Sequence, residues 1–327
     1  MVAIKIYLTG GSGLVGSNML KLAAEQDIEV FAALHHQELK PRPKLNAQRV
    51  DLRSEEDVIA SVKRTAPDAI IHMAFFNDLN LAYEQRHQAW QVMVDSSKHL
   101  AKAAAALEIP IILVSSDWVF DGTQALADEA TPPNPLNYYG VLKVVGETVV
   151  TNYAKGMVAR IAGVYGLNWE SGGRELKQNL GFGNIPNITV EHLTQDRSLG
   201  IWMEGGTLNL RATPSLAWES CEMMLALIRA NYHSGVAGVF HCVGQDHVSR
   251  LEYAQRVAKA FDLDQKLIYS CPIDPSESDL PAYVGIPKDT TLRANYTAEV
   301  TGRKLLSLDE GLAIFKEHWQ EYGLKDF

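Results

Sequence analysis

The first half of the chain alternates short apolar runs with amphipathic segments, and this alternation constrains the fold more than any other feature of the sequence. The apolar runs occupy residues 3–9, 29–34, 68–74, 109–116 and 157–166, and segments with helical spacing lie between them. Strands that alternate with helices build a parallel sheet that helices cover on both faces. We therefore predict an α/β fold with a doubly wound parallel sheet.

A glycine-rich turn, TGGSGLVG at Thr9–Gly16, joins the first apolar run to the first helical segment. In this position Gly10 permits a tight turn, Gly13 lets the backbone approach a pyrophosphate, and Gly16 lets the helix pack on the strand. The free N–H groups at the start of the helix supply donors for the phosphates. The turn therefore predicts dinucleotide binding on a Rossmann-type sheet.

The second half of the chain is less regular. Residues 167–215 are rich in Gly, Asn, Thr and Trp and have weak periodicity, which predicts a loop-dominated covering segment. We predict a dinucleotide-binding domain at residues 1–166, to which the chain returns near 212–248. Residues 167–327 are predicted to be mainly a smaller, substrate-binding region.

The end of the second apolar run bears on the choice of dinucleotide. An NAD site usually has Asp or Glu there for the ribose 2′-hydroxyl, whereas an NADP site has donors for the 2′-phosphate. Here the run ends at His35 and His36, and Lys40 and Arg42 follow, which favours NADP(H) over NAD(H). Two exposed loop histidines are the alternative interpretation. Asp51 either precedes a helix or accepts a hydrogen bond from the adenine amino group.

The segment NPLNYYGVLKVVGE, residues 134–147, contains two tyrosines and one lysine. Residues four apart on a helix share a face and residues five apart do not, so Tyr139 and not Tyr138 faces Lys143. Lys143 is then expected to lower the pKa of the Tyr139 phenol, which donates a proton to a carbonyl oxygen as hydride reaches the carbon. Tyr138 is expected to line the pocket or to pack.

A serine pair in IILVSSDWVFDG supplies the third predicted catalytic group. Ser116 follows a predicted strand at the carboxyl edge of the sheet, where ligands of such folds bind, and can hydrogen-bond the same carbonyl. Ser115 should face the opposite way because side chains alternate along a strand. A helix cap or a turn is the alternative interpretation of the pair.

Taken together, these segments resemble an extended short-chain dehydrogenase/reductase, and within that superfamily the dTDP-4-dehydrorhamnose reductase family. That family also includes the regulatory β subunit of methionine adenosyltransferase. The matching segments are TGGSGLVG, VDLRSEEDV, PDAIIHMA, SSDWVFDG, NPLNYYGVLKVVGE and VARIAGVYG, in the family's order and spacing. The resemblance implies the family's triad at Ser116, Tyr139 and Lys143, and reduction of a nucleotide-linked 4-keto sugar.

The residues predicted to contact ligands form two sets. The cofactor set is Gly10, Ser12, Gly13, Leu14, Val15, Gly16, His35, His36, Asp51, Leu52, Met73, Ala74, Phe75, Val114, Tyr139, Lys143 and Ile161. The substrate set is Phe76, Asp117, Trp118, Gly163, Trp169 and Arg211, of which Arg211 is a candidate ligand of a diphosphate.

Several positions depart from the family pattern. Gly163 stands where the family usually has a tryptophan, Trp118 where it has a tyrosine, and Met93 where it has an asparagine. These changes leave the hydride chemistry intact but leave the sugar open. Trp118, Trp169 and Trp202 are candidates to restore stacking, or they pack in the core or in loops.

The leading hypothesis is an NAD(P)H-dependent reductase of a keto group on a sugar or similar small molecule. One alternative is a sugar-nucleotide epimerase or dehydratase that retains NAD, which the missing acid after the second apolar run disfavours. Another is a non-catalytic, NADP-binding regulatory subunit, which the altered substrate positions keep open.

Composition excludes several other classes of function. The net charge of −9 argues against a nucleic-acid partner, which needs clustered Lys and Arg. We expect no metal site, because the histidines and the three cysteines lack ligand spacing, and the thiols to be reduced. No signal peptide or apolar membrane span is evident, so a cytoplasmic protein without a membrane partner is expected. A homodimer is suggested by analogy alone.

Overall fold

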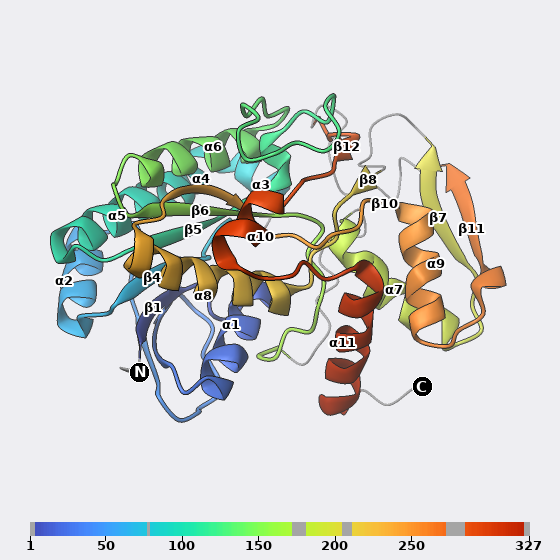
Figure 1. Cartoon of the computed structure of the whole chain (residues 1–327), viewed down its shortest axis with the longest axis horizontal. Coiled ribbons are helices and arrows are strands. Elements are labelled where there is room, and N and C mark those ends of the chain that lie inside the picture. The colour runs from blue at the N-terminus through green and yellow to red at the C-terminus, as the bar shows by residue number, and fades with distance from the viewer. Residues whose placement is uncertain (1–3, 77–78, 172–180, 205–210, 273–284, 324–327) are drawn as a thin grey trace.

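A seven-stranded parallel sheet is the centre of the computed structural model, which describes residues 4–76, 79–171, 181–204, 211–272 and 285–323 (Figure 1). The strand order is β3-β2-β1-β4-β5-β6-β9, and all neighbours are parallel. The strands are β1 (Lys5–Thr9), β2 (Glu29–Leu34), β3 (Leu45–Arg49), β4 (Ala69–His72), β5 (Ile111–Ser116), β6 (Gly156–Ile161) and β9 (Gly238–His241). The predicted Rossmann-type sheet is confirmed, and its order reverses between β1 and β4, where such folds bind ligands.

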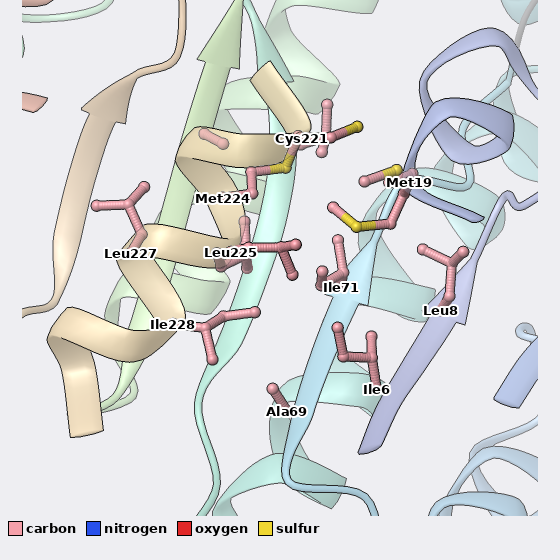
Figure 2. Close-up of a cluster of buried hydrophobic side chains, with 14 of the residues drawn as sticks. Ile6, Leu8, Met19, Ala69, Ile71, Cys221, Met224, Leu225, Leu227 and Ile228 are labelled. Carbon is pink, nitrogen blue, oxygen red and sulfur yellow. The ribbon is translucent and has the colours of Figure 1, made fainter. Parts of the chain in front are cut away.

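Helices cover both faces of this sheet (Figure 1). One face carries α1 (Leu14–Glu25) and α8 (Ala217–Ser234), and the other carries α2 (Glu55–Thr65), α5 (Ser96–Leu107) and α6 (Tyr138–Thr151). Figure 2 shows the first interface, where Leu225 and Ile228 of α8 lie across from Ile71 of β4 and Ile6 of β1. This layer and the one under α2, α5 and α6 together remove both sheet faces from water, as a parallel sheet requires.

The helix that precedes β5 differs from the uniform helix that the spacing predicts. It runs as α4 (Arg86–Trp90), a π-helical segment η1 (Gln91–Asp95) and then α5, and α3 (Leu79–Glu84) precedes it. A π-helical segment widens the turn by one residue and often lies near functional sites. Here it packs against α6, the helix that carries Tyr139.

The smaller region is built on a second core. It contains α7 (Ile185–Leu193), α9 (Arg250–Ala260) and α11 (Leu308–Glu321), with a parallel pair of strands, β7 (Leu199–Glu204) and β11 (Ile268–Pro272). A three-stranded sheet consists of β8 (Arg211–Ala212), β10 (Val248–Ser249) and β12 (Asp289–Thr290). A short helix, α10 (Asn295–Thr301), packs on α8.

The loop-dominated covering segment predicted for 167–215 is therefore wrong in part, because α7 and β7 are regular. Pro186 lies in the first turn of α7, where it favours a helix start, and Val190 and Leu193 of that helix are buried in the second core. Residues 172–180 and 205–210 of this segment lie outside the described residues. Across the part of the chain that is described, no helix is long and apolar enough to cross a membrane.

Candidate active site

The glycine turn at the end of β1 is shaped by backbone contacts that leave no room for side chains. Gly10 has φ +74°, and a Cβ atom there would lie 2.7 Å from the Ala74 nitrogen at the end of β4. A Cβ atom on Gly16 would lie 2.1 Å from the Gly10 carbonyl oxygen, so the helix packs directly on the turn. A Cβ on Gly13 would meet only the Gly10 oxygen, at 3.4 Å, so its outer side is open.

This geometry fits the pyrophosphate of a dinucleotide. The helix α1 begins at Leu14 with no side-chain cap on Gly13, so its first N–H groups, at Leu14, Val15 and Gly16, are left for a ligand. Asn168 donates to the Ser12 carbonyl oxygen at 3.0 Å and thereby joins the turn to the segment after β6.

Buried hydrogen bonds fix the backbone that follows β4, beside the glycine turn. The Thr9 hydroxyl accepts from the N–H groups of Met73 and Ala74, at 3.2 and 3.1 Å, and lies 2.7 Å from Nδ1 of His72. Since both lone pairs of Thr9 are used, its proton goes to Nδ1, and Nε2 of His72 carries the ring proton towards Ser96, at 3.0 Å. Burial lowers the pKa of His72 to about 3, so the ring is neutral.

The loops after β2 and β3 bring together two histidines and an Asp–Arg ion pair. His35 and His36 are exposed, with ring centroids 3.6 Å apart. Partial burial, and then the charges of His36 and Arg53, lower the pKa of His35. Arg53 donates from Nε and Nη2 to the two Asp51 carboxylate oxygens, at 2.9 and 2.8 Å. These hydrogen bonds lower the pKa of Asp51 to about 2. Leu52 lies between Asp51 and Arg53, and its carbonyl oxygen contacts Nδ1 of His99 at 3.0 Å.

The two other cations considered for the 2′-phosphate are bound elsewhere. Arg42 pairs with Glu170, whose side chain is almost fully buried, and the backbone N–H of Lys40 donates to the same carboxylate. The Lys40 ammonium donates to the Trp169 carbonyl oxygen at 2.8 Å. Both cations thus tie the loop after β2 to residues 169–170. Arg53, which no motif in the sequence predicted, lies near His35 instead.

Ser116, Tyr139 and Lys143 come together at the carboxyl edge of the sheet. Ser116 ends β5, and its hydroxyl hydrogen-bonds with Tyr139 of α6. The Lys143 ammonium lies 5.6 Å from the centroid of the Tyr139 ring and donates to the Val114 carbonyl oxygen at 3.0 Å. In register beside Ser116, Ile161 ends β6.

Two local features place Tyr139. Asn137 caps α6 by accepting from the Gly140 N–H at 2.9 Å, so the helix starts one residue before Tyr139. A Cβ atom on Gly140 would lie 2.4 Å from the Trp118 carbonyl oxygen, so only glycine lets the helix approach the end of β5 so closely. The 3₁₀ turn η2 (Asp117–Val119) forms the other side of this contact.

The pKa values in the triad follow from burial. Burial lowers the pKa of Lys143 to about 8. Burial also raises the pKa of the Tyr139 phenol, against the lowering effect of the Ser116 hydrogen bond. The Tyr139 pKa is therefore raised in this structure, whereas its spacing to Lys143 predicted a lowered pKa, and the phenol is protonated across the neutral range.

The neighbouring residues Tyr138 and Ser115 point away from the triad. The Tyr138 hydroxyl donates to the Arg86 carbonyl oxygen at 3.0 Å, and its ring packs on Tyr83. Ser115 is buried and donates to Glu147 at 2.5 Å, so the alternation predicted for the serine pair is confirmed. Glu147 in turn binds Arg160 in a buried ion pair.

Three aromatic side chains surround Tyr139. Phe75 is 42% exposed, and its ring centroid lies 6.5 Å from that of Tyr139 and 4.8 Å from the Lys143 ammonium. Trp118 meets Tyr139 edge to face at 6.1 Å. Phe76 and Tyr139 pack against the same buried apolar cluster, which includes Met93. The Phe75 and Trp118 rings thus give the phenol apolar surroundings.

The other residues of the substrate set lie in different surroundings. Gly163 has φ +47°, and a Cβ there would lie 3.0 Å from Cβ of Phe182, so this backbone disfavours the tryptophan of the family pattern. Trp169 packs against Lys21 of α1 and His318 of α11. Arg211 is exposed on β8.

Asp117 is buried, and its carboxylate accepts from Ser116 and from Thr290 of β12. The sequence did not predict Thr290 as part of the site, because its contact with Asp117 spans 173 positions of the chain.

Trp202 lies in β7, opposite Cys271 of β11. No group of His, Cys, Asp or Glu side chains in the described ranges could hold a metal ion.

A Rossmann-type sheet whose edge presents a hydroxyl, a phenol and an ammonium in this arrangement defines the short-chain dehydrogenase/reductase class, and the added C-terminal sheets make this chain one of the extended type. The family model described as "RmlD substrate binding domain" matches residues 4–181, more than half of the chain. The chain therefore belongs to that family of extended short-chain dehydrogenases/reductases.

Two relatives cover most of the chain. It is 25% identical to the probable low-salt glycan biosynthesis reductase Agl14 of Haloferax volcanii over 319 residues, 97% of this chain and 99% of that protein. It is 28% identical to methionine adenosyltransferase 2 subunit beta of Rattus norvegicus over 260 residues, 79% of this chain and 72% of that protein.

Solved structures share the fold. The dTDP-4-dehydrorhamnose reductase of Bacillus anthracis, in complex with NADP, superimposes with a TM-score of 0.76 at 20% identity, covering 97% of this chain and 99% of that one. MoeE5, in complex with UDP-glucuronic acid and NAD, has a TM-score of 0.76 at 18% identity and covers 97% of this chain and 99% of that one. Nucleotide sugars and both dinucleotides thus occur among the structural neighbours.

Proposed function

We propose that this protein is an NADPH-dependent reductase of a keto group on a nucleotide-linked sugar or a similar small molecule. The observation that carries the proposal is the convergence of Ser116, Tyr139 and Lys143 at the same carboxyl edge of the sheet as the glycine turn. Its family membership and its similarity to a probable glycan biosynthesis reductase support the same reaction.

In this proposal, the bound dinucleotide supplies hydride to the carbonyl carbon. Tyr139, protonated at neutral pH, donates its proton to the carbonyl oxygen. Ser116 donates a hydrogen bond to the same oxygen and stabilises the charge that develops there. Lys143, held by the Val114 carbonyl, keeps a positive charge beside the phenol below about pH 8.

Each part of the dinucleotide has a proposed partner. The turn at Gly10–Gly16 takes the pyrophosphate, and the backbone of Met73 and Ala74 forms the wall beside it. His35, His36 and Arg53 favour the 2′-phosphate of NADPH, since no carboxylate is free at the end of β2 to bind a 2′-hydroxyl and Asp51 is neutralised by Arg53. We propose that residues 167–327 mainly bind the substrate.

The test is consumption of NADPH with a panel of nucleotide-diphosphate 4-keto-6-deoxy sugars and simpler ketones. Tyr139→Phe removes the proposed acid, and we expect kcat to fall by about 10²- to 10⁴-fold, the usual contribution of general acid catalysis. Tyr138→Phe is the matched control, because it removes the neighbouring phenol hydroxyl, which bonds the Arg86 carbonyl instead. A Tyr139→Phe protein as active as Tyr138→Phe would refute the assignment.

A regulatory subunit is the second candidate, and the 28% identity to methionine adenosyltransferase 2 subunit beta favours it. This candidate predicts NADPH binding without turnover of any ketone in the panel, together with stable copurification with a catalytic partner. The remaining alternative is a sugar-nucleotide epimerase or dehydratase, which keeps its cofactor bound through a full cycle. Such an enzyme would instead purify with stoichiometric NAD.

A further inference from the structure

Asp117 lies directly behind the catalytic serine. It is 4% exposed, and its Oδ1 accepts from the Ser116 hydroxyl at 2.9 Å. Its Oδ2 accepts from the Thr290 hydroxyl at 2.5 Å. The carboxylate therefore joins the end of β5 to β12 in the smaller region, and its bond to Ser116 leads into the site.

The Ser116 hydroxyl has one proton and two lone pairs. In the observed arrangement the proton goes to Asp117, and the oxygen accepts from the Trp118 N–H at 3.2 Å and contacts Tyr139. A serine that donates to Asp117 cannot donate to a substrate carbonyl at the same time. If Asp117 is protonated, it can itself donate to Ser116, and the serine proton is then released for the substrate.

We propose that Asp117 is a positioning residue whose protonation sets the direction in which the Ser116 hydroxyl donates. Protonated Asp117 turns the hydroxyl towards the substrate carbonyl, and ionised Asp117 holds it in an inactive direction. This inference rests on the proposed reductase function, because it assigns Ser116 the role of carbonyl donor.

The surroundings of Asp117 allow this change near neutral pH. Burial raises the pKa of the carboxyl to about 6, against the hydrogen bonds from Thr290 and Ser116, which lower it. The titratable group that faces it from α6 is Tyr139, while Lys143 on the same helix is directed to Val114. On β12, Asp289 accepts from Thr291 and lies 4.0 Å from Arg211.

The first test is the pH profile of kcat/KM for ketone reduction. In the wild type we expect kcat/KM to fall about tenfold as pH rises through about 6, since a positioned donor of this kind contributes at least that factor. Asp117→Asn imitates the protonated acid, because its amide donates to Ser116 and its oxygen accepts from Thr290. We expect this variant to lack the step at about pH 6 and to exceed the wild type in kcat/KM above it.

A second pair of variants tests the direction of the shift. Thr290→Val removes a hydrogen bond that lowers the Asp117 pKa, so the step should move to higher pH, whereas Thr290→Ser should leave it in place. A step that persists in Asp117→Asn, or one that Thr290→Val does not move, would overturn the proposal.

Infrared titration separates this inference from the proposed function, because it needs no substrate. A protonated-carboxyl band that disappears as pH rises through about 6 and is missing in Asp117→Asn supports the inference even if no ketone is reduced. In Ser116→Ala the band should persist to higher pH, since the serine hydrogen bond lowers the Asp117 pKa. The absence of such a band, or its indifference to Ser116→Ala, would contradict the inference.

Discussion

At the scale of single residues, the proposed preference for NADPH can be tested at one guanidinium, that of Arg53. Arg53 lies in the loop after β3, where it pairs with Asp51 and lies close to His35. Its side chain is about 40% exposed, so a 2′-phosphate can reach it and replace Asp51 as partner. Arg42, by contrast, is held by a buried carboxylate on Glu170 and is not free to turn towards the cofactor.

We therefore predict that Arg53→Ala reduces kcat/KM for NADPH by about tenfold or more, because a hydrogen bond to a charged group contributes about 1.5–3 kcal/mol. The value for NADH should change little. Arg42→Ala is the matched control and should leave the ratio of the two values nearly unchanged. Measurement of initial rates with both cofactors decides the matter, and an equal loss for NADH and NADPH in Arg53→Ala would speak against a 2′-phosphate contact.

Residue spacing predicted which side chains share a face of one helix or strand. It did not predict which side chains of different elements are in contact. The helical period selected Tyr139 over Tyr138, and strand alternation separated Ser116 from Ser115, because both periods are local. The roles of Arg42 and Arg53 depend on which loops meet, which the sequence does not state. The direction of the Tyr139 pKa likewise depends on burial by surrounding segments.

At the scale of elements, hydrogen bonds tie the π-helical segment η1 to the backbone that follows β4. Ser96, the first residue of α5, lies 3.0 Å from Nε2 of His72 and donates to the Val92 carbonyl oxygen within this helix at 2.5 Å. His72 also hydrogen-bonds with the Thr9 hydroxyl, which in turn accepts from the Ala74 N–H after β4. The helix and the backbone at Met73 and Ala74 are therefore expected to move together.

Ser96→Ala should lower the free energy of unfolding by about 1–3 kcal/mol, because it leaves the buried Nε2 proton of His72 without an acceptor. Ser97→Ala is the control, since Ser97 is equally buried and its hydroxyl donates to the Met93 carbonyl oxygen four residues back in the same helix. Chemical denaturation of both variants compares the two losses. Equal destabilisation would mean that the link to His72 adds nothing.

The existence and order of most elements were predictable because the hydrophobic periods of strands and helices appear within short stretches of consecutive residues. The π-helical segment was not, since Gln91–Asp95 continues the helical spacing and differs only in its hydrogen bonds. Nor was β7, whose regularity arises from pairing with β11, about seventy residues later.

At the scale of the whole molecule, α8 joins the two cores. Met224, Leu225 and Ile228 pack under the large sheet, while Trp218, near the helix start, contacts both cores. Glu219 lies beside it, 3% exposed, and accepts from the Leu306 N–H just before α11 at 2.7 Å. A carboxyl group is thus buried where the sheet region and the smaller region meet.

The stability of this junction should depend on pH. Burial raises the pKa of Glu219 to about 7, so the folded protein holds this proton more tightly than the unfolded chain does. The resulting stability is fully present below the ordinary pKa of about 4.3 and is lost as pH rises through about 7.

Glu219→Gln keeps an acceptor for Leu306 and cannot ionise. We predict that it unfolds at higher denaturant concentration than the wild type at about pH 8, by an amount worth roughly 1–3 kcal/mol, and differs little at about pH 5. Glu252→Gln, on the half-exposed face of α9 beside Arg256, is the control and should show no such gain. If the stability of Glu219→Gln relative to the wild type is the same at both pH values, ionisation of the Glu219 carboxyl costs the folded protein nothing. The junction then tolerates the charge, contrary to the prediction.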